Sequence, residues 1–475
     1  MELAIDIHAH SVFAGGTQAL QLSAEKIKLN QKKAILHLEN TNLTMPLKGI
    51  DLVGTGDCQF SIWTEILKQN LIEHNSGIYT LKSFNKTYFI LQTEIIFTVP
   101  IDGRSKITHV IFLFPNFISV EIFRSLLDKW EVKHEKMARP FIKCISPIQV
   151  SERINAILDI DPFIEAIPAH IMTPQGVFGS NIRINHLNEF FGPVASRLRV
   201  FETGLSADPE FLALIPELDD RVLISNSDAH SSALHRMGRE FTVLSINKFS
   251  YKGIITALRN KKIIFTAEFP PEEGRFFLTG HRAGRKSPGV HSEKDYCYFS
   301  PKHVPRNDIC PICQKTLTIG VFQRCVELCT KQGEIRELEA VHPKQDFIRM
   351  VPLIDILSSV LKIKTKTAKS LITYYHKITD LVGPEKFLWQ MSLDEVKNKI
   401  MDEVDSEIYS AILEVKTGNF TFHPYGFDGT YGSLVIGKKG NFKDINVIIS
   451  SQANLQLDRF LKEVGTSENA HSERE

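Results

Sequence analysis

The sequence lacks any apolar run long enough to cross a membrane, and no basic segment followed by a long apolar stretch stands near its start. We therefore expect a cytoplasmic protein with no membrane partner. An excess of charge of one sign is also missing, because 56 basic and 55 acidic side chains leave a net charge of only +1. Total charge thus neither requires nor excludes a nucleic-acid partner, and the local distribution of charge must decide.

Cysteine is scarce. The chain has seven cysteines, an odd number that argues against the disulfide framework of a secreted protein. Two of them form a CxxC motif, which favours reduced, metal-binding thiols. Internal repeats are absent as well, and 475 residues exceed one ordinary core, so we expect two or three domains.

The N-terminal segment DIHAHS places His8 and His10 two residues apart, directly after the apolar residues 3–5. Residues two apart on an extended strand point to the same face, so both imidazoles can reach one metal ion. A pair of ordinary surface histidines is the alternative interpretation, because so short a pattern recurs by chance.

Further residues of ligand type follow other strand-like runs. Asp57 ends DLVGTGD, His170 ends IEAIPAH, and RVLISNSDAH contains Asp228 and His230; in a predicted hairpin, Glu94 ends YFILQTE and His109 begins HVIFLFP. One such residue is usually a cap or a turn residue, but several at successive strand ends predict a polynuclear metal site at one end of a barrel of parallel strands. The mixed nitrogen and oxygen ligands suit zinc, manganese or iron better than calcium.

Strand-like and helix-like segments alternate up to about residue 266, which predicts an α/β fold. The segment PIDGRSK between residues 87–99 and 107–114 favours a hairpin. The prolines of EFPPEEGR mark a first boundary. We therefore expect a distorted (β/α) barrel over residues 1–270, a zinc-binding module over 271–335 and a mainly helical C-terminal domain over 336–475 that contacts DNA, with a frayed polar tail.

Together, DIHAHS, GTGD, TE, PAH and SNSDAH resemble the PHP (polymerase and histidinol phosphatase) metal-dependent phosphoesterase domain. Within that superfamily the segments GLSAD at 204–208, SNSDAHS at 225–231 and HRMGREF at 235–241 resemble endonuclease Q. A PHP domain, a cysteine-containing zinc module and a helical C-terminal part follow one another in that family too. The resemblance is specific through residue 330 and looser beyond.

The resemblance implies a set of metal ligands. His8, His10, Glu94 and Asp228 would hold one metal; Glu94, His109 and His170 would hold a second, with Glu94 bridging; and Asp57 and His230 would belong to a third position. This chain has GTGD where many PHP domains have a histidine after an aspartate, and VFAGGTQ where many have an acidic ligand after HxHS. Relatives in the endonuclease Q family share the GTGD form.

The reaction that the resemblance implies is incision of double-stranded or single-stranded DNA on the 5′ side of uracil, hypoxanthine, xanthine or an abasic site. Zinc would occupy the site, with Mg²⁺ or Mn²⁺ as the activating metal, and Asp228, His230 and Glu94 would take part in catalysis. Arg236 follows the Asp228 turn closely enough to clamp a phosphate, while Arg239 has a structural role as its alternative. The predicted substrate-binding residues are Gly204, Ser206 and Phe178; core packing is an equal interpretation for Phe178.

The second predicted metal site is a structural zinc. Cys310 and Cys313 form CPIC, and LTIG after it resembles a zinc knuckle. Archaeal endonuclease Q sequences carry another CxxC upstream, where this chain has His281 and Gly284. We expect His281 and Cys297 to complete a Cys3His site, with His291 and His303 as reserves. A redox CxxC is disfavoured, because no thioredoxin-like βαβ pattern surrounds it.

Two stretches are locally basic. Residues 275–306 contain seven Lys or Arg and two acids, and residues 356–379 contain five Lys and no acid. They are candidate phosphate-contacting surfaces, or else a solvated loop and helix face. Two other functions stay open: a phosphatase acting on a small phosphomonoester, and a non-catalytic zinc-ribbon DNA-binding protein. A replication clamp is a further candidate partner, although the tail shows no clamp-binding peptide.

Overall fold

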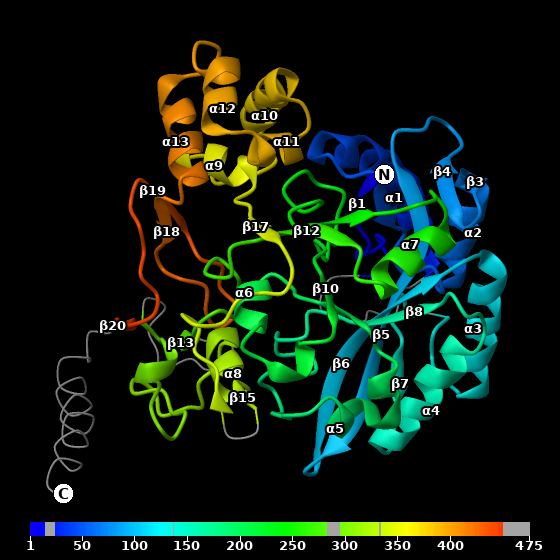
Figure 1. The fold of residues 1–475 in the computed structure, drawn as a ribbon. Helices are drawn as coiled ribbons and strands as arrows, with labels where there is room; N and C mark the ends of the chain where they lie inside the picture. Colours follow the sequence, from blue (N-terminus) through cyan, green and yellow to red (C-terminus); the bar gives the residue numbers. More distant parts are fainter. Residues whose placement is uncertain (15–23, 136, 283–294, 332–333, 450–475) are drawn as a thin grey trace, which may run out of the picture.

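The computed structural model describes residues 1–14, 24–135, 137–282, 295–331 and 334–449, which form an α/β fold (Figure 1). The predicted polar tail at 467–475, the reserve ligand His291 and part of the basic stretch 275–306 lie outside these residues. None of the helices in the described ranges is long and apolar enough to span a membrane.

The strands and helices alternate along most of the chain. The strands are β1 Glu2–Asp6, β2 Leu52–Gly54, β3 Leu71–Asn75, β4 Ile78–Leu81, β5 Tyr88–Ile101, β6 Arg104–Phe114, β7 Phe141–Lys143, β8 Glu165–Pro168, β9 Val200–Glu202, β10 Val222–Ile224, β11 Phe241–Ser245, β12 Ile263–Glu268, β13 Thr279–Arg282, β14 Tyr296–Phe299, β15 Thr330–Lys331, β16 Glu334–Ile335, β17 Phe347–Arg349, β18 Phe420–Phe422, β19 Leu434–Ile436 and β20 Asn446–Ile449.

The helices cover the outside of the sheet in the first part of the chain and form a separate group in the last part (Figure 1). They are α1 Ala24–Lys48, α2 Ser61–Asn70, α3 Phe117–Lys129, α4 Pro147–Leu158, α5 Asn188–Phe191, α6 Pro209–Leu212, α7 Tyr251–Arg259, α8 Val321–Glu327, α9 Leu353–Val360, α10 Lys369–Val382, α11 Glu385–Gln390, α12 Leu393–Ile400 and α13 Ser406–Lys416, with short 3-10 helices η1 Gly192–Ser196, η2 Pro216–Leu218 and η3 Pro301–His303.

The central sheet is mixed, so the expected barrel of parallel strands is wrong in part. Its hydrogen-bonded order is β17-β12-β11-β1-β2-β5-β4-β3, with β6 between β5 and β8. Strands β1, β2 and β5 run parallel, and so do β9 and β10, but β11 and β6 are antiparallel to their neighbours. The backbone of Ser225, just after β10, donates to the hydroxyl of Thr242 on β11 and brings the ends of the strands together.

The predicted hairpin is present as β5 and β6, which pair in register from Leu91 opposite Phe114 to Ile101 opposite Arg104. Asp102 and Gly103 turn the chain, both with positive φ (48° and 73°). A two-residue turn of this kind matches the twist of the strands that it joins, and Asp-Gly adopts it readily. The hairpin is the reason why the sheet is not a regular βα barrel.

Polar caps begin several of the outer helices. Asn116 accepts a hydrogen bond from the backbone of Ser119 at the start of α3, and Ser250 accepts from Gly253 at the start of α7. Such caps satisfy backbone donors that have no partner in the first turn. The buried side of α7 includes Ile254 at four residues' distance from Leu258, the spacing of one helix face that packs on a sheet.

The C-terminal part does not form one block after residue 335. Strand β17 extends the central sheet beside β12, and β20 joins β14 and β13 in a small separate sheet. Helices α9 to α13 lie between these two strands along the chain and pack together as a separate group (Figure 1). The chain after residue 335 therefore adds one strand to each of the two earlier sheets, because short strands need a partner edge to satisfy their backbone groups. The three domain boundaries stay a prediction.

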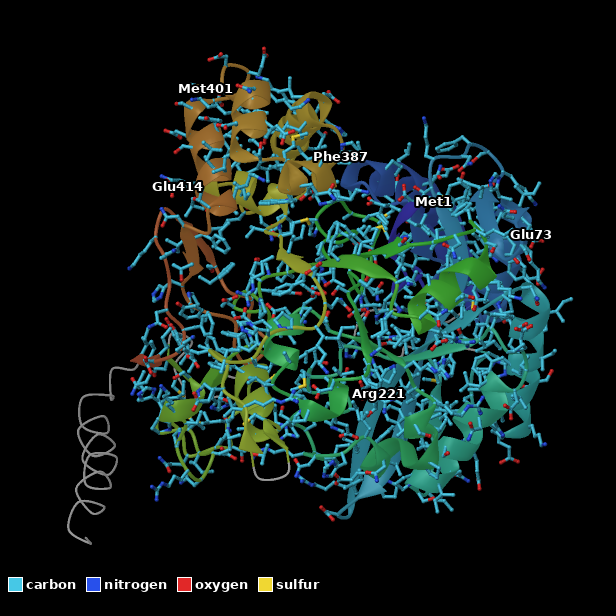
Figure 2. The ribbon with its side chains drawn as sticks, viewed as in Figure 1. Met1, Glu73, Arg221, Phe387, Met401 and Glu414 are labelled. Carbon is cyan, nitrogen blue, oxygen red and sulfur yellow. The ribbon has the colours of Figure 1, made fainter. Side chains whose placement is uncertain are left out.

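A buried ion pair joins the helical part to the barrel. Lys48 at the end of α1 donates to Glu385 on α11, and both side chains are buried. Glu385 also accepts from the hydroxyl of Tyr375 and from the backbone of Leu353. Figure 2 labels Phe387, which lies on α11 near this junction.

Candidate metal centre

Three of the predicted ligands have a positive φ, a backbone conformation that residues other than glycine rarely adopt. Asp57 follows β2 with φ 46°, His170 follows β8 with φ 30°, and Asp228 follows β10 with φ 46°. Strained backbone of this kind persists only where the surroundings fix it, and it concentrates at functional sites. In this conformation each side chain turns away from the direction of the strand before it. All three side chains lie at the same end of the fold.

The remaining pair of predicted ligands comes from inside the hairpin. The sequence suggested that Glu94 and His109 stand at strand ends. In the structure they lie inside the strands, because β5 and β6 continue past them. Glu94 pairs with Ile111 and His109 pairs with Ile96, so the two lie diagonally on one face. Nδ1 of His109 is 2.7 Å from Oε1 of Glu94.

The predicted ligands gather around Glu94 and Asp228. Nε2 of His8 is 3.5 Å from Oε1 of Glu94, and Nε2 of His10 is 3.5 Å from its Oε2. Nε2 of His170 is 3.3 Å from Oε1 of the same carboxylate. Oδ1 of Asp228 lies 3.6 Å from Nε2 of His8 and 3.1 Å from Nε2 of His10.

Three overlapping groups of side chains are therefore arranged to hold metal ions. Each group converges its ligand atoms on one point, and Glu94 and His10 are each shared by two groups: His8, His10 and Glu94; Glu94, His109 and His170; His10, Asp228 and His230. Shared ligands of this kind are typical of sites that hold adjacent metal ions. The structure thus brings together all the predicted ligands of this site except Asp57, which lies behind His10.

Unpaired atoms point into the cluster. Among the described residues, Nε2 of His8, Nε2 of His10 and Oδ1 of Asp228 are buried and make no hydrogen bond of good geometry, although the last two atoms lie 3.1 Å apart. Buried polar atoms without partners are costly, and a bound ion removes that cost. The residues present therefore fit a centre of divalent metal ions.

The outer nitrogens of the histidines are held by other side chains. Nδ1 of His8 lies 2.9 Å from Oε1 of Glu202, and Nδ1 of His10 lies 3.3 Å from Oδ1 of Asp57. Nδ1 of His170 is 2.8 Å from the hydroxyl of Thr173. Contacts of this kind fix the ring and leave the inner nitrogen available to a metal. Asp57 is placed to orient His10, and its part as a direct ligand stays a prediction.

The charges of the cluster favour ionised carboxylates. Burial alone raises the pKa of Glu94, but His109 and the other histidines around it lower the pKa well below its usual value. Asp228 behaves in the same way: burial raises its pKa, while His230 and His8 bring it far lower. Burial lowers the pKa of His8, yet the carboxylates of Glu202 and Asp228 raise it above the usual value. The carboxylates of Glu94 and Asp228 are thus held in their ionised form, which is the form that binds a cation.

Sequence reasoning missed two residues of the site. Glu202 ends β9 behind His8, and an acidic residue at the end of the apolar run RVFE is the signal that would have found it. Arg139 donates to Oε2 of Glu94 over 3.2 Å and is buried. It precedes Pro140 in a segment without a ligand-type pattern, so the sequence carries no signal for it.

A cavity of about 660 Å³ opens beside the cluster. Asp228 and His230 lie in its wall together with Arg236, whose role as a phosphate clamp stays a prediction. Arg239 lines the same cavity, although it is nearly buried and donates to the backbone oxygen of Ser227. Arg275, from the basic stretch, Phe276, Thr318 and Tyr431, which lies between β18 and β19, also line the cavity.

The predicted substrate-binding residues differ in position. Gly204 and Ser206 line the cavity, and a Cβ on Gly204 would come within 2.5 Å of the Cβ of His170. Phe178 does not line it. Its side chain is fully buried in the core of the barrel, which corrects its assignment to base stacking and favours the packing interpretation.

The second basic stretch lies close to the same region. Lys364 and Lys366 face Arg236 across an adjoining cavity of about 430 Å³. Lys366 also forms an ion pair with Asp355, and this pair offsets part of the positive charge of the cavity wall. The residues between α9 and α10 are a loop rather than one continuous helix, with Lys362 at φ 55°.

The predicted zinc ligands form a second cluster. Sγ of Cys313 lies 3.1 Å from Nδ1 of His281, and Sγ of Cys297 lies 3.6 Å from Sγ of Cys310. Two thiolates on one tetrahedral zinc would stand about 3.8 Å apart, given Zn–S bonds of about 2.3 Å. His281 and Cys297 are register partners on β13 and β14, while Cys310 and Cys313 belong to one tight turn. His281, Cys310 and Cys313 form a group that could hold a metal ion, and Cys297 as a fourth zinc ligand stays a prediction. Cys325, on α8, is packed in the core.

Comparison with known proteins agrees with this geometry. No family model matches the chain. It is 28% identical over 272 residues, or 55% of its length, to the uncharacterized protein MJ0043 of Methanocaldococcus jannaschii, of which the match covers 30%. The chain spans less than half the length of the curated relatives that it matches.

Two solved structures resemble the chain over most of its length. One is the lesion-specific endonuclease PfuEndoQ from Pyrococcus furiosus, with a TM-score of 0.68 and 23% identity, covering 92% of this chain and 96% of that one. The other is endonuclease Q in complex with a 27-mer duplex that carries an abasic lesion at the active site, with a TM-score of 0.71 and 22% identity, covering 92% and 97%. The resemblance indicated by the sequence motifs is thus confirmed at the level of the fold, and this chain has the fold of endonuclease Q.

Proposed function

We propose that the protein is a metal-dependent DNA endonuclease that cleaves the phosphodiester on the 5′ side of a deaminated base or an abasic site. One observation carries the proposal: overlapping ligand groups that share Glu94 open into a cavity walled by arginines. The likeness in fold to a lesion-specific endonuclease, and to a relative crystallised with a damaged duplex, supports DNA as the substrate.

The chain's own residues bind and orient a phosphodiester in this scheme. Zinc in the centre, with Mg²⁺ or Mn²⁺ as the activating metal, supplies charge neutralisation of the phosphate and activation of a water. Arg236 lies in the cavity wall beside Asp228 and His230, so its guanidinium can hold a phosphate oxygen next to the cluster. Arg275 lies in the wall of the same cavity and can hold a neighbouring phosphate.

The cavity also suits an extruded nucleotide. Enzymes that act at one damaged base take it out of the stack, and a weakly paired or missing base costs less to extrude. Gln175 and Asn181 line the wall and offer amide groups to a base edge, while Gly204 lets the backbone approach closely. Uracil, hypoxanthine and xanthine share such a hydrogen-bonding edge, which makes them the proposed substrates with the abasic site.

The test uses end-labelled duplexes that each carry one uracil, hypoxanthine, xanthine or abasic site, and an undamaged duplex, incubated with Mg²⁺ or Mn²⁺. We expect a single cut 5′ to the lesion, loss of cutting in Asp228→Ala, and normal cutting in Asp220→Ala, which removes an exposed aspartate outside the site. Hydrolysis of a chromogenic phosphomonoester with no cleavage of any DNA would replace the proposal with the phosphatase. DNA binding without cleavage would replace it with the binding protein.

A further inference from the structure

A loop between β8 and α5, residues 171–184, forms one wall of the cavity beside the metal cluster. Thr173, Pro174, Gln175 and Asn181 face the cavity. The loop contains no regular helix or strand, and its own backbone hydrogen bonds are those of short turns, such as Gly176 to Thr173 and Phe178 to Ile171. Contacts from outside the loop add to these turns in holding the wall in place.

Two buried cations hold this loop through its carbonyl oxygens. Nζ of Lys106, from β6, donates to the carbonyls of Gly179 over 3.1 Å and Ile182 over 2.9 Å. Arg324, from α8, donates from Nε to Phe178 over 3.0 Å and from Nη2 to Ile184 over 2.9 Å. Both side chains are almost fully buried, at 0% and 1% exposed.

The two cations differ in the part of the molecule from which they come. Lys106 belongs to the barrel, and burial together with the charge of Arg324 lowers the pKa of its amine to about 7. Arg324 belongs to the helix that follows the cysteine turn. Its guanidinium also forms an ion pair with Glu327 on the same helix, which offsets part of the cost of burying the charge.

The position of α8 depends on the Cys/His module. The backbones of Val321 and Phe322 donate to the carbonyls of Phe276 and Phe277, directly before β13. The backbone N–H of Gly320 donates to the hydroxyl oxygen of Thr279, two residues from His281 on the same strand. The N-terminus of α8 is therefore tied to the strand that carries one of the four clustered ligands.

A second bridge joins the same two parts. Nη2 of Arg183, in the loop, donates to Oδ2 of Asp308 over 2.6 Å. Asp308 stands two residues before Cys310, with φ 55° at the start of the cysteine turn, and its carbonyl accepts from Leu317 after that turn. Arg183 also lies 3.5 Å from Oε1 of Glu327. The loop thus contacts the module at the cysteine turn as well as through Arg324.

We propose that Arg324 is a positioning residue through which the Cys/His module sets the shape of the substrate-facing loop 171–184. On this account the metal bound by His281, Cys297, Cys310 and Cys313 controls the cavity beside the catalytic cluster. The module is then part of the specificity apparatus rather than a separate DNA-binding attachment. The consequence for catalysis rests on the proposed function; the consequence for the loop does not.

The first test measures hydrogen–deuterium exchange of the full-length protein, which needs no activity. In Arg324→Ala we expect the amides of residues 173–184 to exchange at least tenfold faster, with β1 and β6 as protected as before and with unchanged Mn²⁺ binding. Arg306→Ala, which removes an exposed arginine of the same module, is the matched control and should leave the loop unchanged. Unaltered exchange in the loop of Arg324→Ala would overturn the proposal.

The link to the metal is tested with Cys313→Ser, which removes one ligand of the cluster. We expect faster exchange of the loop in this variant too, and no further increase when Arg324→Ala is added, because both changes act through α8. Two independent, additive increases would contradict a route through Arg324. Arg324→Lys keeps a donor and should restore part of the protection.

Kinetics on the abasic duplex give the functional readout. In Arg324→Ala we expect KM to rise at least tenfold while kcat changes less than threefold, since the loop contacts substrate and the metal cluster is untouched. A fall in kcat with unchanged KM would overturn the role in substrate binding. If the wild-type protein cleaves no DNA, the proposed function fails, and the exchange measurements still decide whether Arg324 positions the loop.

Discussion

Glu202 is the centre of a hydrogen-bond network that holds His8 in the metal cluster. Its Oε1 lies 2.9 Å from Nδ1 of His8 and also accepts from the amide of Asn226, while its Oε2 accepts from the backbone of His170. Glu202 is 1% exposed, so no solvent competes for these contacts. One carboxylate on β9 therefore fixes ligands that belong to two different strands.

Replacing Glu202 should weaken metal binding without removing a ligand. We expect Glu202→Ala to lower the affinity for Mn²⁺ by about 10- to 100-fold, the range seen when the partner of a metal-bound histidine is removed. Titration calorimetry on the metal-depleted protein measures it. Glu152→Gln, which changes an exposed residue of α4, is the control. An affinity equal to that of the wild type would mean that His8 keeps its orientation without Glu202.

Asp57 offers a test between an orienting residue and a direct ligand. Its Oδ2 accepts from both the backbone and the hydroxyl of Ser11, and its Oδ1 faces Nδ1 of His10. Since both oxygens have partners, we expect Asp57→Asn to keep the metal stoichiometry and to lower the affinity by roughly tenfold. Elemental analysis of the purified variant gives the stoichiometry. Loss of one metal per chain would restore Asp57 to the ligands.

The candidate site was more predictable from the sequence than the sheet that carries it. His8, His10, His170 and Asp228 each follow a short apolar run, and that local signal was sufficient to group them. The order and direction of the strands depend on contacts between distant segments, such as β1 with β11, and no local pattern records them. For that reason the mixed sheet was predicted as parallel.

Residues that act from behind the site were the hardest to predict. Glu202 and Arg139 contact ligands rather than being ligands, so neither belongs to a motif with a fixed spacing. For Phe178 the sequence leaves base stacking and core packing equally open, and only the fold shows that its side chain fills the core beneath the loop. For the second metal site, the structure groups His281 with Cys310 and Cys313, while Cys297 as the fourth zinc ligand stays a prediction.

Gly204 is required by the packing around His170. A Cβ at this position would lie 2.5 Å from the Cβ of His170 and 2.8 Å from its Cα, and Gly204 has φ 76°. We expect Gly204→Ala to lower the free energy of unfolding by about 1 to 3 kcal/mol, as overpacking of a tight site does, and to weaken metal binding by moving the imidazole. Gly103→Ala is the matched control, because Gly103 has φ 73° and open space around it. Equal losses in both variants would show that backbone strain alone is responsible.

Glu268 should make the stability of the protein depend on pH. It is fully buried on β12, and burial raises the pKa of its carboxyl to about 8, although hydrogen bonds from Ser225 and Thr203 act in the other direction. Because the folded pKa exceeds the unfolded value of 4.5, its contribution to stability is full below about pH 4.5 and is lost as the pH rises to 8. The loss is on the order of a few kcal/mol, at about 1.4 kcal/mol per pKa unit.

We expect Glu268→Gln, whose amide does not titrate, to show a smaller decrease in Tm between pH 5 and 8 than the wild type. Some decrease should remain, because burial also raises the pKa of Glu240. Exposed Glu337→Gln should follow the wild type. Parallel curves for Glu268→Gln and the wild type would mean that Glu268 is ionised in the folded protein.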